Sequence, residues 1–253
     1  MVVSAESVGQ EMMRKPNGKS RVITSDLTLV IASLRYSSWS VRAWLALTHA
    51  GARFDTKIIG LLTEPDWKEH ILTYSPAGKF PVLLIDDLVI HESLAICEWA
   101  NERFPDAGLW PEDPMQRARA RSVSTEMATG FEKIRENMPM HDHARVPGFE
   151  PDDETRAQIE HLFGLWQECL RVSGGPYLFG DFCIADCMYL PMASRLRSYN
   201  IPLTDTAADY SQALWSHPTI RAWTEAARSG PAIPVYDEYV RGMGGVLPAR
   251  GSQ

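Results

Sequence analysis

Two features in the stretch from Tyr74 to Ile96 have the chemistry to bind a short anionic guest. Pro81 stands at the mouth of an apolar run, and its nitrogen cannot donate to a sheet ladder. It must therefore sit at an edge, at a first position or in a special turn, of which a cis peptide bond is one kind, and the backbone beside it is open to a guest. Ser93 precedes the apolar residues of a helix, and such a capped helix start attracts carboxylates. Together with Glu92, these features predict a docking site for a peptide-like anion.

A hairpin and a helix must position these residues. The apolar runs on either side of Asp86-Asp87 are rich in Val, Ile and Leu, which predicts two strands joined by a tight turn. A helix from Ser93 to about Phe104 follows. Taken singly, each feature fits an ordinary hairpin or a capped helix, and only the combination favours a binding site.

The chain before the hairpin has the pattern of a strand, a helix, a strand and a short helix. The expected ranges are Leu27 to Ser33, a helix after Ser37-Ser38-Trp39-Ser40 that ends at Gly51, Phe54 to Ile59, and Glu64 to Leu72. A strand, helix and strand in this length predict a parallel βαβ unit. With the hairpin and its helix, the order βαβ-α-ββ-α predicts a mixed four-stranded sheet of the thioredoxin-like kind. The serine run stands where a Cys-x-x-Cys would be, so disulfide exchange is not expected.

In the second half of the chain, the pattern of apolar residues predicts helices only. The periodic apolar positions fall in Met115 to Met138, Asp152 to Val172, Ile184 to Leu196, Ala207 to Trp215 and Pro218 to Arg228. We therefore expect an α/β plus all-α chain. The expected divisions are a mobile tail over 1–25, a thioredoxin-like domain over 26–106, a linker over 107–115, an all-helical domain over 116–243, and a second tail over 244–253.

Composition limits the kinds of molecule that this chain is expected to bind. With 45% hydrophobic and 23% charged residues in 253, the chain can bury a full core, and its net charge of -7 argues against binding to nucleic acid. No apolar run near the start is long enough for a signal or a membrane span. The four cysteines lie in apolar helical patterns, which favours a reducing, cytoplasmic location. His141-Asp142-His143 is unspecific as a metal motif, so no metal is expected.

Several motifs together resemble the cytosolic glutathione transferases. They are Ser-Pro-x-Gly-Lys-Phe-Pro at 75–81, Glu92-Ser93, the linker motif Trp110-Pro111 and the helical second half. The resemblance covers about Leu27 to Arg228. The serine run is similar to the Ser-Ser-x-Ser run of the serine-type members, which are zeta-like or bacterial.

The resemblance implies how glutathione would bind. The backbone of Phe80, before Pro81, would pair with the cysteinyl part of glutathione as one rung of β-strand addition. Ser93 and its helix start would take the γ-glutamyl carboxylate, and Glu92 would accept from the ammonium. Lys79 is placed to approach the glycyl carboxylate, although a solvated lysine fits as well.

The resemblance also implies that a hydroxyl stabilises the glutathione thiolate. A free thiol with a pKa of about 8.5 is only slightly ionised at neutral pH. Ser37 is the first candidate, as the first serine of the family run. Ser38 and Ser40 compete with it, since any of the three could simply cap the helix, and the adjacent Tyr36 must be weighed because other members use a tyrosine.

A second-substrate pocket is expected between the two halves. Its candidates are Trp39, Met127, Phe131, Arg135 and Met138. The apolar residues fit a plain helix-helix core equally well, whereas Arg135 could hold an acidic or carbonyl-bearing substrate. For Arg42, one turn into the first helix, a structural ion pair is the expected role.

One departure from the family concerns a helix cap. Members usually open the core helix of the second half with Ser/Thr-x-x-Asp, whereas this chain has Cys183-Ile184-Ala185-Asp186. Since a thiol is a weaker cap than a hydroxyl, we expect Asp186 to carry more of the capping and the helix start to depend on it.

The expected function is that of a glutathione-dependent transferase, with glutathione as co-substrate and a small electrophile as partner. Conjugation, isomerisation, dehalogenation and ether cleavage all share the thiolate step. The alternative is a non-catalytic protein of the same fold that works by binding or as a scaffold. The resemblance implies a homodimer, and neither nucleic acid nor a membrane is expected as a partner.

Overall fold

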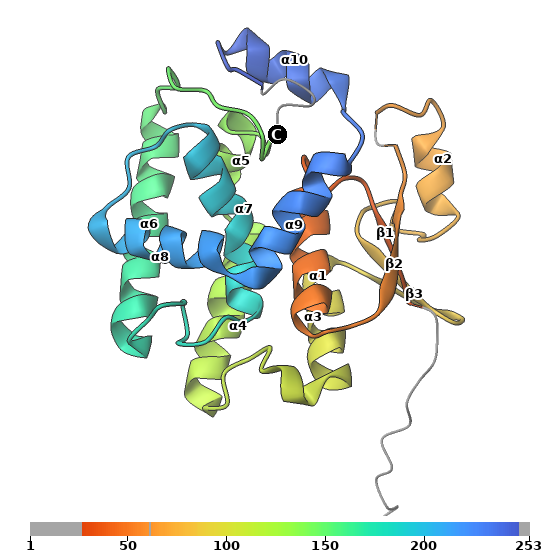
Figure 1. Ribbon diagram of the computed structural model, residues 1–253, viewed down its shortest axis with the longest axis horizontal. Coiled ribbons are helices and arrows are strands. Elements are labelled where there is room, and N and C mark those ends of the chain that lie inside the picture. The colour runs from red at the N-terminus through yellow and green to blue at the C-terminus, as the bar shows by residue number, and fades with distance from the viewer. Residues whose placement is uncertain (1–26, 61, 248–253) are drawn as a thin grey trace, which may run out of the picture.

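The computed structural model describes residues 27–60 and 62–247, so the expected tail over 1–25 lies outside the described residues. A sheet with its own helices forms one half of the molecule, and a bundle of helices forms the other (Figure 1). The large apolar core is shared by both halves, because residues as distant as Leu29 and Trp223 belong to one buried cluster.

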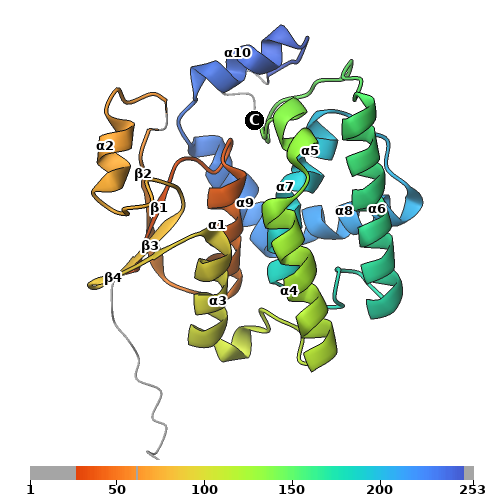
Figure 2. The same cartoon turned by 180° about the vertical axis from the view of Figure 1, so that it is seen from behind.

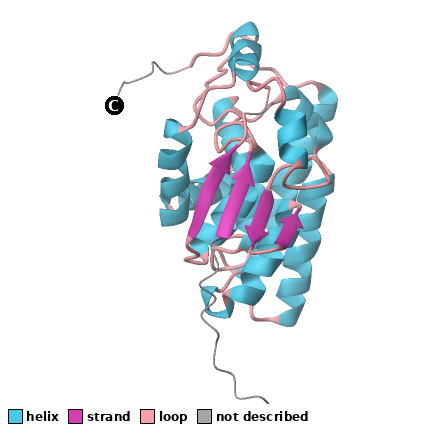
Figure 3. Ribbon diagram, turned by 90° about the vertical axis from the view of Figure 1, so that its right-hand side faces the viewer, coloured by secondary structure: helices cyan, strands magenta, loops and turns pink. Residues whose placement is uncertain are grey.

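The sheet has four strands within the described residues, in the order β2-β1-β3-β4. The strands are β1 (Leu27–Ile31), β2 (Phe54–Ile58), β3 (Val82–Ile85) and β4 (Leu88–His91). β1 pairs in parallel with β2 and antiparallel with β3, and the β3–β4 hairpin turns at Asp86, whose φ is 50°. Figure 3 shows the strands side by side with helices behind them. The predicted thioredoxin-like mixed sheet is confirmed.

Helices cover both faces of the sheet. They are α1 (Ser38–His49), α2 (Trp67–Leu72) and α3 (Ser93–Arg103). Leu29 and Ile31 of β1 join the large core with α1 and α3, whereas Val30 joins a small cluster with Ile71 of α2. Neighbouring residues of a strand point to opposite faces, which is why one strand serves two cores.

The second half is helical, as predicted. It comprises a 3-10 turn, η1 (Pro105–Ala107), and the helices α4 (Pro114–Thr129), α5 (Glu132–Asn137), α6 (Asp153–Ser173), α7 (Ile184–Ser198), α8 (Asp205–Ser216), α9 (Pro218–Ser229) and α10 (Pro234–Gly242). α7 is buried along almost its whole length and packs against α1 and α4, with α4 and α6 seen from behind in Figure 2. None of the described helices is long and apolar enough to cross a membrane.

The carboxylate of Asp186 caps the start of α7, as expected. Its carboxylate accepts hydrogen bonds from Cys183 N at 2.9 Å, Leu178 N at 3.2 Å and the Tyr210 hydroxyl at 2.9 Å. Burial raises the pKa of this carboxyl group to about 6, against the hydrogen bonds, which lower it. One side chain therefore ties three segments to the beginning of the central helix.

The prediction of a single helix over Met115 to Met138 is wrong. α4 ends at Thr129 and α5 begins at Glu132, because Gly130 is extended and Phe131 has a left-handed φ of 58°. The apolar stripe continues across the break, which concealed it in the sequence. Glycine at 130 was the local signal, since glycine is a poor helix former.

The final helix, α10, was not predicted. Its apolar residues recur at helical spacing, with Val235 and Tyr239, and Tyr236 and Val240, four residues apart. This spacing and Pro234 at the first turn are the signals that were available. Beyond α10, Val246 forms an antiparallel bridge with Arg145, so residues assigned to a C-terminal tail from 244 take part in the fold.

Candidate functional site

Ser37 and Ser40 share a small hydrogen-bond system at the start of α1. Ser37 is the N-cap, and its Oγ accepts from Ser40 N at 3.3 Å and from Ser40 Oγ at 2.9 Å. Ser40 Oγ in turn accepts from Ala32 N at 3.3 Å. Since the Ser37 oxygen accepts twice, its own hydrogen is left to donate to another atom.

Exposure distinguishes the three serines. Ser40 is fully buried, which removes it as a partner for a bound thiol, and Ser38 is 5% exposed at the first position of α1. Ser37 is half-buried and lies at the positive end of the helix dipole. A thiolate at this end meets a hydroxyl donor and unpaired backbone amides, which both favour the ionised form.

Tyr36 has a different partner. Its hydroxyl donates to Asp237 Oδ1 at 2.7 Å, and its ring stacks on Tyr236 of α10 with the centroids 5.5 Å apart. Only 5% of the side chain is exposed. The tyrosine hydroxyl is therefore occupied by a carboxylate from the C-terminal helix.

The hairpin presents an open backbone beside Pro81. The Phe80-Pro81 peptide bond is cis, and the ladders that β3 forms with β1 and β4 begin at Val82. The N–H and C=O of Phe80 therefore lie outside the ladder, at the edge where an extended guest can add one rung. Lys79 is exposed next to it.

The start of α3 differs from the expectation. The helix begins at Ser93 itself, Glu92 holds the cap position with a φ of 71°, and Ser93 is only 2% exposed. The prediction that Ser93 caps this helix is thus wrong, because the unusual backbone at Glu92 moves the helix start by one residue. Glu92 is exposed, and the amides of the first turn of α3 remain available for a carboxylate.

Only two of the five residues expected to line the second-substrate pocket meet at a partly open surface. Trp39 and Arg135 are both half-buried, and Arg135 Cζ lies 5.8 Å from the centroid of the Trp39 ring. The other three belong to the core: Met127 and Met138 are fully buried and Phe131 is 5% exposed. Side chains that are enclosed on all sides have no surface to offer a substrate, so the core interpretation applies to them.

Two further arginines lie near Arg135, and one of them also stacks on Trp39. Arg42 Cζ is 4.4 Å from the ring centroid of Trp39, and its Nε donates to Met188 O at 3.2 Å. Among the described residues, Arg42 forms no ion pair, contrary to the expectation. The Nη1 and Nη2 atoms of Arg42 are buried and have no hydrogen-bond partner among these residues. Arg195 of α7 is also buried, and it donates to the carbonyl oxygen of Met138 at 2.8 Å.

Arg42, Arg135 and Arg195 form what we call the arginine group. Burial, together with the charges of Arg195 and Arg135, lowers the pKa of Arg42 to about 9. Burial likewise lowers the pKa of Arg195 to about 10. Within residues 27–60 and 62–247, no carboxylate forms a salt bridge with any of the three. The signal that sequence reasoning missed is an arginine, Arg195, inside an otherwise apolar helix.

The metal motif considered in the sequence is part of the protein interior. Asp142 Oδ1 accepts from Ser194 Oγ at 3.2 Å and from Arg197 Nη2 at 2.9 Å. His141 bonds to Asp237 at 3.0 Å. In the part of the chain that the structure describes, no three His, Cys, Asp or Glu residues are grouped so as to hold a metal ion.

Comparisons with known proteins agree with the geometry. The model of the glutathione S-transferase N-terminal domain matches residues 36–103. A probable maleylacetoacetate isomerase from Caenorhabditis elegans is 31% identical over 198 residues, which are 72% of this chain and 88% of that protein. The maleylacetoacetate isomerase of Rattus norvegicus is 28% identical, over 66% of this chain and 76% of its own length.

Solved structures share the fold. A bacterial zeta-class glutathione S-transferase, maleyl pyruvate isomerase, has a TM-score of 0.63 at 24% identity and covers 79% of this chain and 97% of its own. A glutathione transferase homologue from Burkholderia with bound glutathione also has a TM-score of 0.63, at 22% identity, and covers 80% of this chain and 98% of its own. The chain therefore belongs to the cytosolic glutathione transferase superfamily as a zeta-like member, an enzyme that uses glutathione as its co-substrate.

Proposed function

We propose that this enzyme uses the thiolate of glutathione to attack a small electrophile that carries a carboxylate, with isomerisation as its principal reaction. The arginine group beside Trp39 is the observation that carries the proposal. Three arginines, two of them buried and none paired with a carboxylate among the described residues, are costly to fold unless an anion joins them. The relatives named maleylacetoacetate isomerase support an acid as substrate.

Glutathione is proposed to lie along the open edge beside Pro81. The backbone of Phe80 would pair with its cysteinyl residue, the first turn of α3 at Ser93 would receive the γ-glutamyl carboxylate, and Glu92 would accept from the ammonium. Lys79 is the proposed contact for the glycyl carboxylate. Support comes from the free backbone of Phe80 and from the unpaired amides at the start of α3.

Ser37 is the proposed thiol partner. Its hydroxyl donates to the sulfur, which favours the thiolate over the thiol. Ser38 is the second candidate, and Ser40 is left out because it is enclosed. In the proposed isomerisation the thiolate adds to one carbon of an activated double bond, and the π electrons move to the conjugated carbonyl group. Rotation about the new single bond and expulsion of the thiolate restore the double bond in the other geometry, so glutathione is regenerated.

The arginine group is proposed to hold the acid while this happens. Arg135 is only half-buried and lies over Trp39, so it is the member that an entering substrate would meet first. Arg42 is fully buried beside Trp39, so we propose that its charge attracts the carboxylate through space without touching it. A guanidinium suits this task because its donors match the two oxygens of a carboxylate.

Kinetics with an acid and with its uncharged ester test whether the enzyme recognises the carboxylate or accepts any electrophile. Arg135→Gln should raise KM for an unsaturated keto acid such as maleylacetoacetate by about tenfold to a hundredfold, because a charged hydrogen bond contributes about 1.5 to 3 kcal/mol. KM for glutathione and turnover of the uncharged methyl ester should change little. Arg156→Gln, at an exposed arginine of α6, is the matched control. An equal loss on acid and ester would overturn the proposal.

A further inference from the structure

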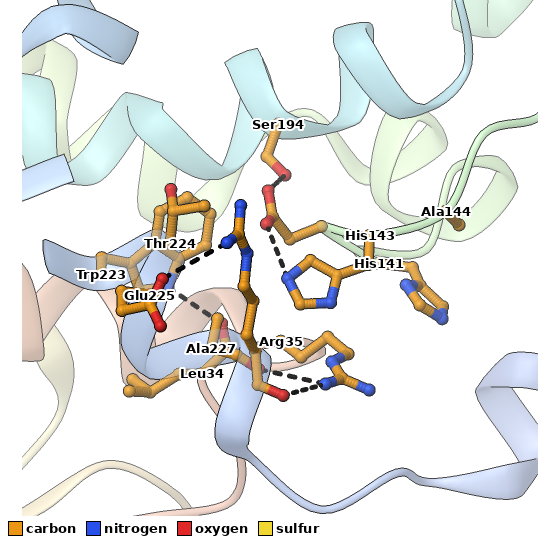
Figure 4. A network of polar contacts seen from close by, with 12 residues as sticks. Leu34, Arg35, His141, His143, Ala144, Ser194, Trp223, Thr224, Glu225 and Ala227 are labelled. Atoms are coloured by element: carbon orange, nitrogen blue, oxygen red, sulfur yellow. Dashed lines mark hydrogen bonds and ion pairs between the residues drawn. The ribbon is translucent and has the colours of Figure 1, made fainter. Parts of the chain in front are cut away.

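The residues just before Ser37 are held by the helical half. The carbonyl oxygen of Leu34 accepts a hydrogen bond from Trp223 Nε1 at 2.9 Å. Arg35 Nη2 donates to the carbonyl oxygen of Ala227 at 3.2 Å. Figure 4 shows both α9 residues beside this loop. The loop that leads to the proposed thiol partner is thus fixed from outside its own domain.

Tyr36 makes the last of these contacts, with α10. Its hydroxyl donates to Asp237 Oδ1 at 2.7 Å, and His141 Nε2 lies 3.0 Å from the same oxygen. We call Tyr36, His141 and Asp237 the Asp237 junction. One carboxylate oxygen joins the loop before Ser37, the segment after α5 and the C-terminal helix.

The protonation states at the junction are mutually consistent. Burial and the hydrogen bond to Asp237 raise the pKa of Tyr36, and burial lowers the pKa of His141. Burial alone would raise the pKa of Asp237, but hydrogen bonds from Tyr36 and His141 outweigh it, and the net shift is downward. At neutral pH a phenol and a neutral imidazole therefore both donate to a carboxylate, which places the imidazole proton on Nε2.

Few other contacts hold α10. Val240 is its only buried residue among those the structure describes, and Asp237 is the only described side chain of this helix with hydrogen bonds to the rest of the chain. Figures 1 and 2 show α10 apart from the other helices, above the boundary between the two halves. The position of α10 and the position of Tyr36 therefore depend on the same carboxylate.

We propose that Asp237 is a positioning residue for thiolate formation: through Tyr36 it fixes the loop that ends at Ser37, and thereby the direction of the Ser37 hydroxyl. The inference rests on the proposed role of Ser37. Ser37 follows Tyr36 directly and caps α1, so a displaced Tyr36 moves the hydroxyl relative to bound sulfur. Small misplacements of a reacting group reduce rates strongly.

Asp237→Ala in the full chain tests the inference. Ultraviolet absorbance of the thiolate measures the pH at which bound glutathione is half ionised. We expect this pH to rise by about one unit, and kcat below it to fall about tenfold, because one pKa unit is a tenfold change in the thiolate fraction. KM for the electrophile should stay within about twofold, since the arginine group is unchanged. Asp237→Asn, which keeps an acceptor oxygen, should shift less.

Two further variants examine the same contact. Tyr36→Phe keeps the ring stacked on Tyr236 but removes the hydroxyl, and should shift the half-ionisation pH in the same direction as Asp237→Ala. Glu238→Ala, the adjacent exposed acid of α10, should leave that pH unchanged. Complete loss of thiolate in Tyr36→Phe would make the tyrosine the thiol donor and would overturn the inference.

Ser37→Ala separates this inference from the proposed function. If Ser37→Ala keeps the thiolate signal, the role of Ser37 fails, and the positioning role of Asp237 fails with it. If Ser37→Ala loses the signal while Asp237→Ala lowers only the melting temperature, the role of Ser37 stands and Asp237 is merely structural.

Discussion

The arginine group and the Asp237 junction both bury polar groups near the boundary between the sheet half and the helical half, but their charges are balanced differently. At the junction, a carboxylate receives hydrogen bonds from Tyr36 and His141. In the arginine group, Arg42 has only a carbonyl oxygen as partner and leaves two nitrogens unpaired among the described residues. The junction thus pairs its carboxylate with two donors, although His141 Nδ1 has no partner among the described residues, whereas the arginine group contains no carboxylate.

This difference separates two uses of buried charge. Satisfied networks fix geometry, which suits a loop that must aim a hydroxyl. An uncompensated charge lowers stability and is retained where it binds something, so strongly shifted pKa values mark candidate sites. Substitutions should therefore have opposite effects on stability in the two places.

Arg42→Met should show the largest effect. Turnover of a carboxylate substrate is expected to fall about tenfold, because the buried charge of Arg42 would attract the acid through space. The melting temperature should stay equal or rise, because an unpaired buried charge is removed. Kinetics with the acid and its ester, together with thermal unfolding, measure both. Arg53→Met at an exposed arginine is the control. A marked drop in melting temperature would mean that the bond to Met188 makes Arg42 structural.

Asp186→Ala extends the comparison to a buried carboxylate whose hydrogen bonds all come from the helical half. It leaves Cys183 N, Leu178 N and the Tyr210 hydroxyl without their acceptor. We expect the melting temperature to fall by roughly 5 to 10 °C, since each buried unpaired donor costs about 1 to 3 kcal/mol. Asp209→Ala, at an exposed position next to Tyr210, is the matched control. An unchanged melting temperature would refute the capping role of Asp186.

The smallest effect is expected on the pH dependence of the melting temperature, from substitution of His143, which lies beside the Asp237 junction. Burial lowers its pKa from 6.5 to about 4, so the unfolded chain takes up a proton before the folded chain does. Its contribution to stability is present above pH 6.5 and is lost as pH falls toward 4. His143→Asn should therefore reduce the drop in melting temperature between pH 7 and 5 by about a few degrees. His91→Asn, at an exposed histidine of β4, should not; equal drops in all three proteins would exclude His143 as the cause.

Most of the sheet half could be predicted because its signals are local. Aliphatic runs, the turn at Asp86 and the proline at 81 each act over a few residues, and together they predicted the mixed sheet and the open edge. The break at Gly130 was missed because the apolar stripe continues past it. The helix α10 was missed although Val235, Tyr236, Tyr239 and Val240 recur at helical spacing in it.

The residues of the candidate site likewise fall into those that local sequence motifs predicted and those that only the tertiary structure decided. Ser37, Phe80 and the start of α3 stand in short contiguous motifs, so the sequence alone led to them and to the family. It did not distinguish Ser37 from its neighbours, because burial of Ser40 and the partner of Tyr36 depend on segments far along the chain. Met127 and Met138 looked like lining residues because an apolar stripe does not state what faces it.

By itself the sequence determined the thioredoxin-like half, the helical half, the likeness to glutathione transferases and the short motifs for glutathione. Only the tertiary structure brought Arg135 and Arg195 close to Arg42, and joined Tyr36 to Asp237 across 201 positions. The physical reason is that charge and hydrogen bonding act through space at a few ångströms. Propensity and periodicity, which the sequence displays, act only between residues that are near in the chain.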